Sequence, residues 1–108
     1  MAITLTLEEL KALLGEKSPG GGSHSLVVGQ QYLIRTVTFY YTGKLEAVTD
    51  TDLVLSNAAW IADTGRFGEC LKTGSLNEVE PFVGNVIVSR GVLVDATVWP
   101  HKLTDVAK

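Results

Sequence analysis

Residues 32–60 read YLIRTVTFYYTGKLEAVTDTDLVLSNAAW, and this stretch decides the fold class. It is dense in Ile, Val, Thr, Phe and Tyr, the residues that fit the pleated surface of a β-strand. Gly43 interrupts the run, and a glycine inside a strand often marks a bend or a bulge. Alternation resumes at Lys44, and residues 49–52 supply turn formers before a Leu-Val-Leu run begins at Leu53. The stretch predicts a long bent strand followed by its hairpin partner.

Two further strands are predicted near the C-terminus. Residues 85–89 contain the apolar run Val86-Ile87-Val88, and residues 92–99 alternate between valine or alanine and other residues. The dipeptide Arg90-Gly91 separates them, and Pro100 ends the second strand. Residues 101–108 are expected to form a frayed tail.

Between these strand regions, residues 61–83 break the strand pattern and form an insert. Asp63 is a candidate cap for a short helix that carries Phe67 and Leu71 on one face and stops at Gly74. The rest of the insert is acidic and ends near Pro81. Long ordered connections of this kind are more often functional than short ones.

The N-terminal residues predict a helix and a linker in front of the strands. Thr6 and Glu9 form a capping box, and leucines recur at spacings of three and four before Gly15. Residues 16–24 are rich in glycine and serine and predict a flexible linker. A phosphate-binding loop is not expected, because no Lys-Ser/Thr follows the glycines and the spaced-glycine pattern is absent. We therefore expect one domain over residues 1–108, with a helix over 1–15 and a β-barrel over 25–100.

Composition narrows the class of protein and its partners. Of 108 residues, 45% are hydrophobic and 19% are charged, which is typical of a globular domain that buries some surface against copies of itself. The net charge is −3 and the nine Lys and Arg residues are scattered, so the composition does not favour nucleic acid. No apolar run approaches the roughly 20 residues of a membrane helix. With one cysteine and no secretion signal, we expect a cytoplasmic protein without membrane contact.

Two pieces of the sequence resemble the two motifs of the Sm-like (LSm and Hfq) family. The first is GKLEAV at 43–48 with LVLSNA at 53–58, and the second is VIVSRGVLV at 86–94. The resemblance implies a small SH3-like, five-stranded bent barrel with a short N-terminal helix. It also implies a ring of about five to seven subunits that pair their edge strands, which would cover edges that a single barrel leaves open.

The resemblance also implies where RNA would bind. Arg90 and Gly91 match the family's Arg-Gly, but Asp52 stands where an RNA-binding Asn is usual. A carboxylate there repels phosphate and lacks the donor of an amide. We therefore expect a non-enzymatic, ring-forming scaffold with itself as partner. The alternatives are an RNA-binding ring, and a small-molecule binder or enzyme that uses the 61–83 insert.

Other candidate sites are weaker. Cys70 with His24 or His101 is a conceivable nucleophile and base, but no local pattern supports it, and the sequence lacks closely spaced metal ligands. We expect no catalytic residue, metal or cofactor. Asp50 and Asp52 fit a turn better than a paired-carboxylate site. Arg66 and Phe67 are the predicted partner contact, because Arg and aromatic residues are enriched at interface centres. The aromatic residues Phe39, Tyr32, Tyr40 and Tyr41 fit core or interface packing better than a base-stacking platform.

Overall fold

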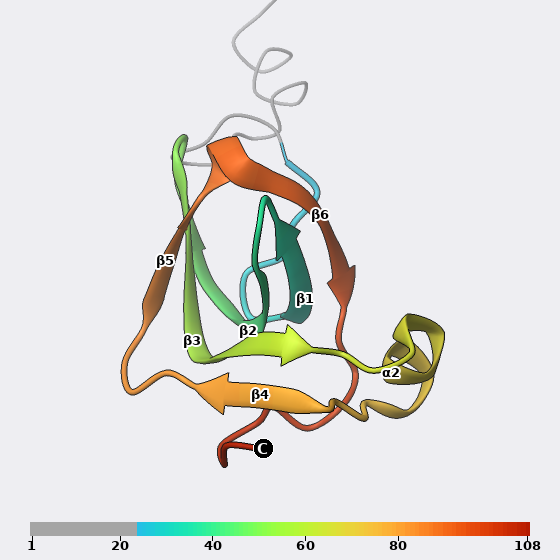
Figure 1. The fold of residues 1–108 in the computed structure, drawn as a ribbon. Coiled ribbons are helices and arrows are strands. Elements are labelled where there is room, and N and C mark those ends of the chain that lie inside the picture. The colour runs from blue at the N-terminus through green and yellow to red at the C-terminus, as the bar shows by residue number, and fades with distance from the viewer. Residues whose placement is uncertain (1–23) are drawn as a thin grey trace, which may run out of the picture.

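The structure is a computed structural model that describes residues 24–108 (Figure 1). The predicted helix over 1–15 and all but the last residue of the predicted linker lie outside this range. The described elements, in chain order, are β1 (Gln31–Thr36), β2 (Tyr40–Val48), β3 (Asp52–Asp63), α2 (Phe67–Thr73), β4 (Glu78–Pro81), β5 (Val86–Ser89), the 3₁₀ helix η1 (Arg90–Val92) and β6 (Leu93–Val98).

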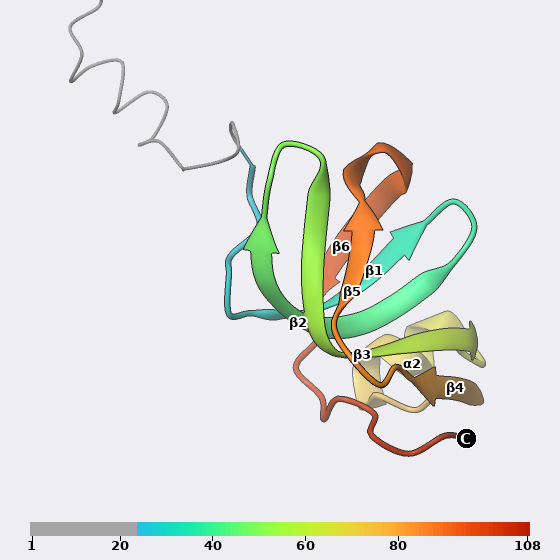
Figure 2. The same cartoon turned by 90° about the vertical axis from the view of Figure 1, so that its left-hand side faces the viewer.

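The strands form one antiparallel, six-stranded sheet that is strongly curled (Figures 1 and 2). The strand order is β4-β3-β2-β1-β6. β5 lies off this path and pairs with the first half of β3, whereas β4 pairs with the second half. The predicted mainly-β class is confirmed. The sheet has six strands instead of five. One of them, β4, lies in the 61–83 insert, where no strand was predicted, and the long strand predicted from Tyr32 is divided into β1 and β2.

The bend at Gly43 is confirmed, although the predicted single strand is divided. The β2–β3 register shifts between Thr42 and Lys44, and a Cβ at Gly43 would lie 3.1 Å from the Cβ of Leu55. The continuous strand expected from Tyr32 is wrong, because the chain reverses at 37–39. There the Thr36 hydroxyl donates to the Phe39 carbonyl at 2.7 Å and accepts from its N–H at 3.1 Å. A side chain that satisfies two backbone groups can favour a turn even among strand-forming residues.

β3 bends sharply in its middle, so that its two halves pair with different strands (Figure 1). Asn57 has a φ of 49°, a left-handed conformation that asparagine tolerates better than most residues. Before this residue β3 pairs with β5, and after it with β4. The corner therefore lets the side of β3 that faces away from β2 pair with two different strands.

Two apolar clusters form the core. The first fills the concave side of the curled sheet and includes Leu45, Leu53 and Leu55. The second includes Leu33, Cys70 and Trp99, and it packs α2, β4 and the C-terminal residues against the sheet.

The insert and the tail differ in part from expectation. The helix is confirmed and ends at Gly74, whose φ is 82°, but Asp63 does not cap it. Arg66 is at the N-cap without a side-chain hydrogen bond, and Asp63 accepts instead from the N–H of Gly65 at 2.8 Å. The tail predicted to fray returns to β4, where Lys108 exchanges two backbone hydrogen bonds with Val79 at 2.8 and 3.0 Å.

Candidate functional site

Within residues 24–108, three strands, β4, β5 and β6, each pair with only one other strand, and the tail bonds Val79 on the outer side of β4. β5 pairs only with β3, and β6 pairs only with β1. The two strands diverge from η1, so their free edges do not pair with each other (Figure 1). Both strands carry exposed aliphatic side chains beside the exposed Ser89 and Thr97, with Ile87 68% exposed, Val94 56% and Val98 50%. An unpaired edge that carries aliphatic side chains is a template for pairing with another chain.

Asp52, Arg90 and Gly91 are brought to one corner, beside η1, although Asp52 is far from the others in sequence. Asp52 faces Ser89 across the β3–β5 ladder. The Arg90 guanidinium donates to the Thr49 carbonyl, and the Arg90 N–H donates to the Thr51 carbonyl at 2.8 Å. Arg90 therefore ties the β5–β6 junction to the β2–β3 turn. A guanidinium used in this way has fewer donors left for phosphate.

On β6, Asp95 forms a two-pronged ion pair with Arg35 of β1. Nε of Arg35 donates to Oδ1 of Asp95 at 2.8 Å, and Nη2 donates to Oδ2. The hydrogen bonds from Arg35 lower the pKa of the Asp95 carboxyl, and the opposing effect of desolvation does not cancel this. Arg35 also lies over two aromatic rings, 5.3 Å from the Phe67 centroid and 5.8 Å from that of Tyr40.

The ion pair predicts a loss of stability in acid. A carboxyl group whose pKa is lower in the folded state stabilises the fold above its unfolded pKa of about 3.9, and this contribution disappears as the pH falls through the folded value. Asp95→Asn should therefore lower the urea midpoint at pH 6 and have much less effect near pH 2.5. Urea unfolding at both pH values checks this, and an equal loss at the two would refute it.

The two residues of the predicted partner contact, Arg66 and Phe67, lie in different surroundings. Arg66 is exposed at the start of α2. Phe67 is 36% exposed, and its ring packs edge-on against Tyr40 with centroids 6.5 Å apart. Phe67 thus helps to hold α2 on the sheet, and the partner role of the pair stays a prediction.

The side chains of Cys70 and His101 pack against neighbouring residues. Cys70 is fully buried in the second cluster, and burial raises the pKa of its thiol, which disfavours the thiolate a nucleophile needs. His101 Nε2 lies 2.8 Å from the Leu71 carbonyl, and its ring packs on Trp99 with centroids 4.8 Å apart. In residues 24–108, no group of three or more His, Cys, Asp or Glu side chains is placed to hold a metal ion.

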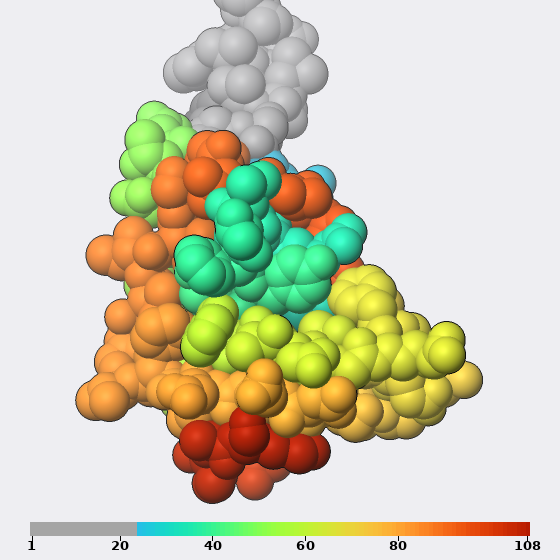
Figure 3. Space-filling view, in the orientation of Figure 1, coloured from blue at the N-terminus to red at the C-terminus, as the bar shows by residue number. Residues whose placement is uncertain are grey.

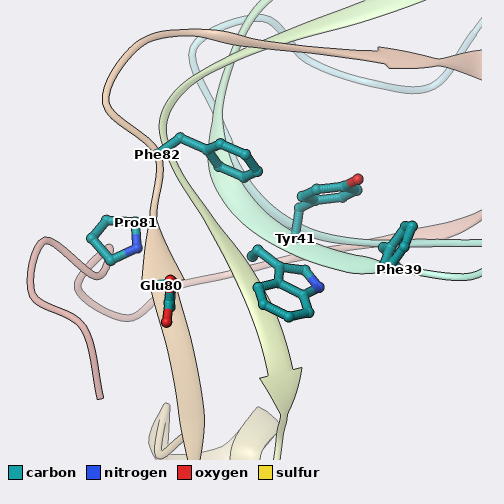
Figure 4. Close-up of a pocket in the computed structure, with 6 residues that line it drawn as sticks. Phe39, Tyr41, Glu80, Pro81 and Phe82 are labelled. Atoms are coloured by element: carbon teal, nitrogen blue, oxygen red, sulfur yellow. The ribbon is translucent and has the colours of Figure 1, made fainter.

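A hollow lined by aromatic side chains lies where the β1–β2 turn, β3 and β4 meet (Figures 3 and 4). A pocket of about 350 Å³ is lined by Phe39, Tyr41, Trp60, Glu80, Pro81 and Phe82. The Phe39 and Trp60 rings meet edge to face at 6.4 Å, and those of Tyr41 and Phe82 are tilted by 36° at 6.1 Å. We call this the aromatic pocket.

The sequence identified only part of this pocket. Of the four aromatic residues considered together, Tyr32 is buried and accepts the Val27 N–H at 2.8 Å. Tyr40 packs with the second cluster, so the core interpretation is confirmed for these two. Phe39 and Tyr41 line the aromatic pocket, and Tyr41 also packs against the first cluster. Trp60 and the Glu80-Pro81-Phe82 segment were missed, because only the β3–β4 register, in which Trp60 faces Glu80, brings them together.

None of the helices within residues 24–108 has the length and apolar character needed to cross a membrane. The chain matches no protein-family model, no curated protein and no solved structure with which it was compared.

Proposed function

We propose that this chain is a non-enzymatic assembly domain whose copies join by pairing the free edge of β5 with the free edge of β6 of the next copy. The observation that carries the proposal is the pair of open edges with Ile87, Val94 and Val98 exposed on them. The pairing would cover backbone donors and acceptors together with aliphatic surface.

The geometry of the two edges favours a ring. The contact joins two different surfaces of the same chain, and repeated head-to-tail contacts close into rings when the rotation between copies allows it. The strand connectivity supports a barrel of the SH3-like or Sm-like kind, because β6 follows β5 through a 3₁₀ turn and returns to β1. We infer a ring of about five to seven copies from the resemblance described above.

The assembly proposal is tested by the solution mass of the full chain, measured by light scattering on a sizing column. We expect about five to seven times 11.6 kDa. Ile87→Lys and Val94→Lys should each shift the protein towards the monomer, because a charge on an edge opposes strand pairing. Their circular dichroism should stay that of the folded parent, since both side chains are exposed.

A matched control is Val28→Lys. Val28 is 56% exposed, the same fraction as Val94, but lies outside both edges. It should leave the mass unchanged. A monomeric parent protein would contradict the proposal outright, and equal effects of the lysines at 28 and 94 would contradict the role of the edges.

RNA binding by the same ring is the less favoured alternative. The Arg90 guanidinium already donates to the Thr49 carbonyl, and Asp52 lies at the same corner. The alternative of a ligand site on the 61–83 insert gains one point of support, because Glu80, Pro81 and Phe82 of the insert line the aromatic pocket.

A further inference from the structure

The aromatic pocket is one of two adjacent hollows that combine aromatic rings with a carboxylate. The second hollow, of about 460 Å³, shares Phe39 and Trp60 with the first and includes Asp63. Glu80 lines the first hollow, and no Lys or Arg lines either one. Within residues 24–108, the Glu80 carboxylate forms no ion pair and accepts no side-chain hydrogen bond. The pocket therefore offers negative charge and ring faces without a cation from the described part of the chain.

Elsewhere in the molecule, aromatic rings and a carboxylate together hold an arginine side chain. Arg35 lies over the Tyr40 and Phe67 rings while its guanidinium is held by the Asp95 carboxylate. The fold thus contains one aromatic and carboxylate site whose occupant is an arginine, and a second, exposed site with the same chemistry. A cation over an aromatic ring is attracted by the negative face of the ring, and a nearby carboxylate adds to that attraction.

We propose that the aromatic pocket binds an arginine side chain of a partner protein. Arginine fits better than lysine because its flat guanidinium stacks on rings and loses less hydration on burial. The Glu80 carboxylate would accept its N–H groups while Trp60 and Tyr41 contact its faces. This site is independent of the open edges of β5 and β6.

The charges around the pocket argue against a nucleic acid as the occupant. Glu80 and Glu78 are exposed on β4, and Asp63 faces Glu78 in the β3–β4 register. Three carboxylates close together repel a phosphate backbone, so base stacking on these rings would lack the basic partners that usually accompany it. The same charges attract an arginine-bearing segment.

The test uses the ¹⁵N-labelled full chain and a five-residue peptide, acetyl-Gly-Gly-Arg-Gly-Gly-amide, as the probe. The chain has two tryptophans, of which Trp60 lines the pocket and Trp99 is 1% exposed. We expect the indole N–H signal of Trp60 to shift on titration while that of Trp99 stays in place. The shift should saturate with a dissociation constant at or below about 1 mM.

Three comparisons identify what is recognised. A peptide with citrulline, the uncharged isostere of arginine, should bind at least about fivefold more weakly if the positive charge matters. Glu80→Gln should weaken binding of the arginine peptide by about fivefold. Glu78→Gln removes the same charge two residues away on the same exposed strand, outside both hollows, and should change binding by less than about twofold.

Each other outcome overturns the proposal. Absence of a saturable Trp60 shift would mean that the pocket does not take arginine. Equal binding of the citrulline peptide would show an apolar site without charge recognition. Equal effects of Glu78→Gln and Glu80→Gln would reduce the interaction to general attraction by the acidic strand. A Trp60 shift with a uridine oligomer and none with the peptide would assign the rings to nucleic acid.

Discussion

Replacing Trp99 by alanine is expected to lower the free energy of unfolding by about 3–5 kcal/mol. Trp99 is 1% exposed and belongs to the second core cluster, where it joins the sheet to α2, β4 and the C-terminal residues. Its Nε1–H donates to the Lys102 carbonyl at 3.4 Å, a long hydrogen bond, so most of the loss comes from the cavity. Urea unfolding followed by circular dichroism measures the change.

Trp60→Ala provides the matched comparison for Trp99. Trp60 is half-buried at the aromatic pocket. Its replacement should lower the free energy of unfolding by about 1–2 kcal/mol, because Trp60 removes less apolar area from water than Trp99 does. Trp99→Phe should fall between the two, since a smaller ring fills part of the cavity. An equal loss at 60 and 99 would contradict the assignment of Trp99 to the core.

The second large effect is expected at Gly74, where alanine should cost about 2–4 kcal/mol. Gly74 ends α2 with a φ of 82°, a conformation in which a Cβ is strained. That Cβ would also lie 2.6 Å from Cγ of His101, which packs over the end of the helix. Strain and collision therefore act together. The free energy of unfolding, again from urea titration, checks the sum.

Two other glycines separate the causes. Gly29 has a φ of 97° and nothing within 4 Å of a built Cβ, so Gly29→Ala should show the backbone strain alone, about 1–2 kcal/mol. Gly68 is an exposed residue of α2 with open space around a Cβ, so Gly68→Ala should stabilise by about 0.5–1 kcal/mol. In a His101→Gly background, which removes both the imidazole and the Cβ that lies 2.7 Å from the built Cβ, Gly74→Ala should cost about as much as Gly29→Ala. A loss that stays larger would contradict the collision with the His101 side chain.

The sequence was most informative where a local rule and the tertiary fold agree. The strands around Gly43, the helix that stops at Gly74 and the strand pair flanking Arg90 are all present. The sequence-based prediction was wrong at residues 37–39, where the chain turns, and at residues 78–81 of the insert, where it missed β4. Strand-forming residues continue through the β1–β2 turn, and the signal for that turn is a Thr36 side chain that bonds the backbone. β4 is only four residues long and contains two glutamates and a proline, so its composition gives no strand signal.

The candidate surfaces, too, could be predicted from the sequence only in part. The apolar character of residues 86–88 and 92–94 follows from sequence, but whether those strands have free edges depends on their partners elsewhere in the sheet. The aromatic pocket depends entirely on register, because Trp60 faces Glu80 across the β3–β4 pair.

The sequence by itself determined the β class, the bend at Gly43 and the end of α2, because each depends on the conformational preferences of a few neighbouring residues. The tertiary structure alone decided the open edges, the aromatic pocket and the return of the tail to β4. These features need contacts between residues far apart in the chain, and their geometry is set by the packing of the whole sheet.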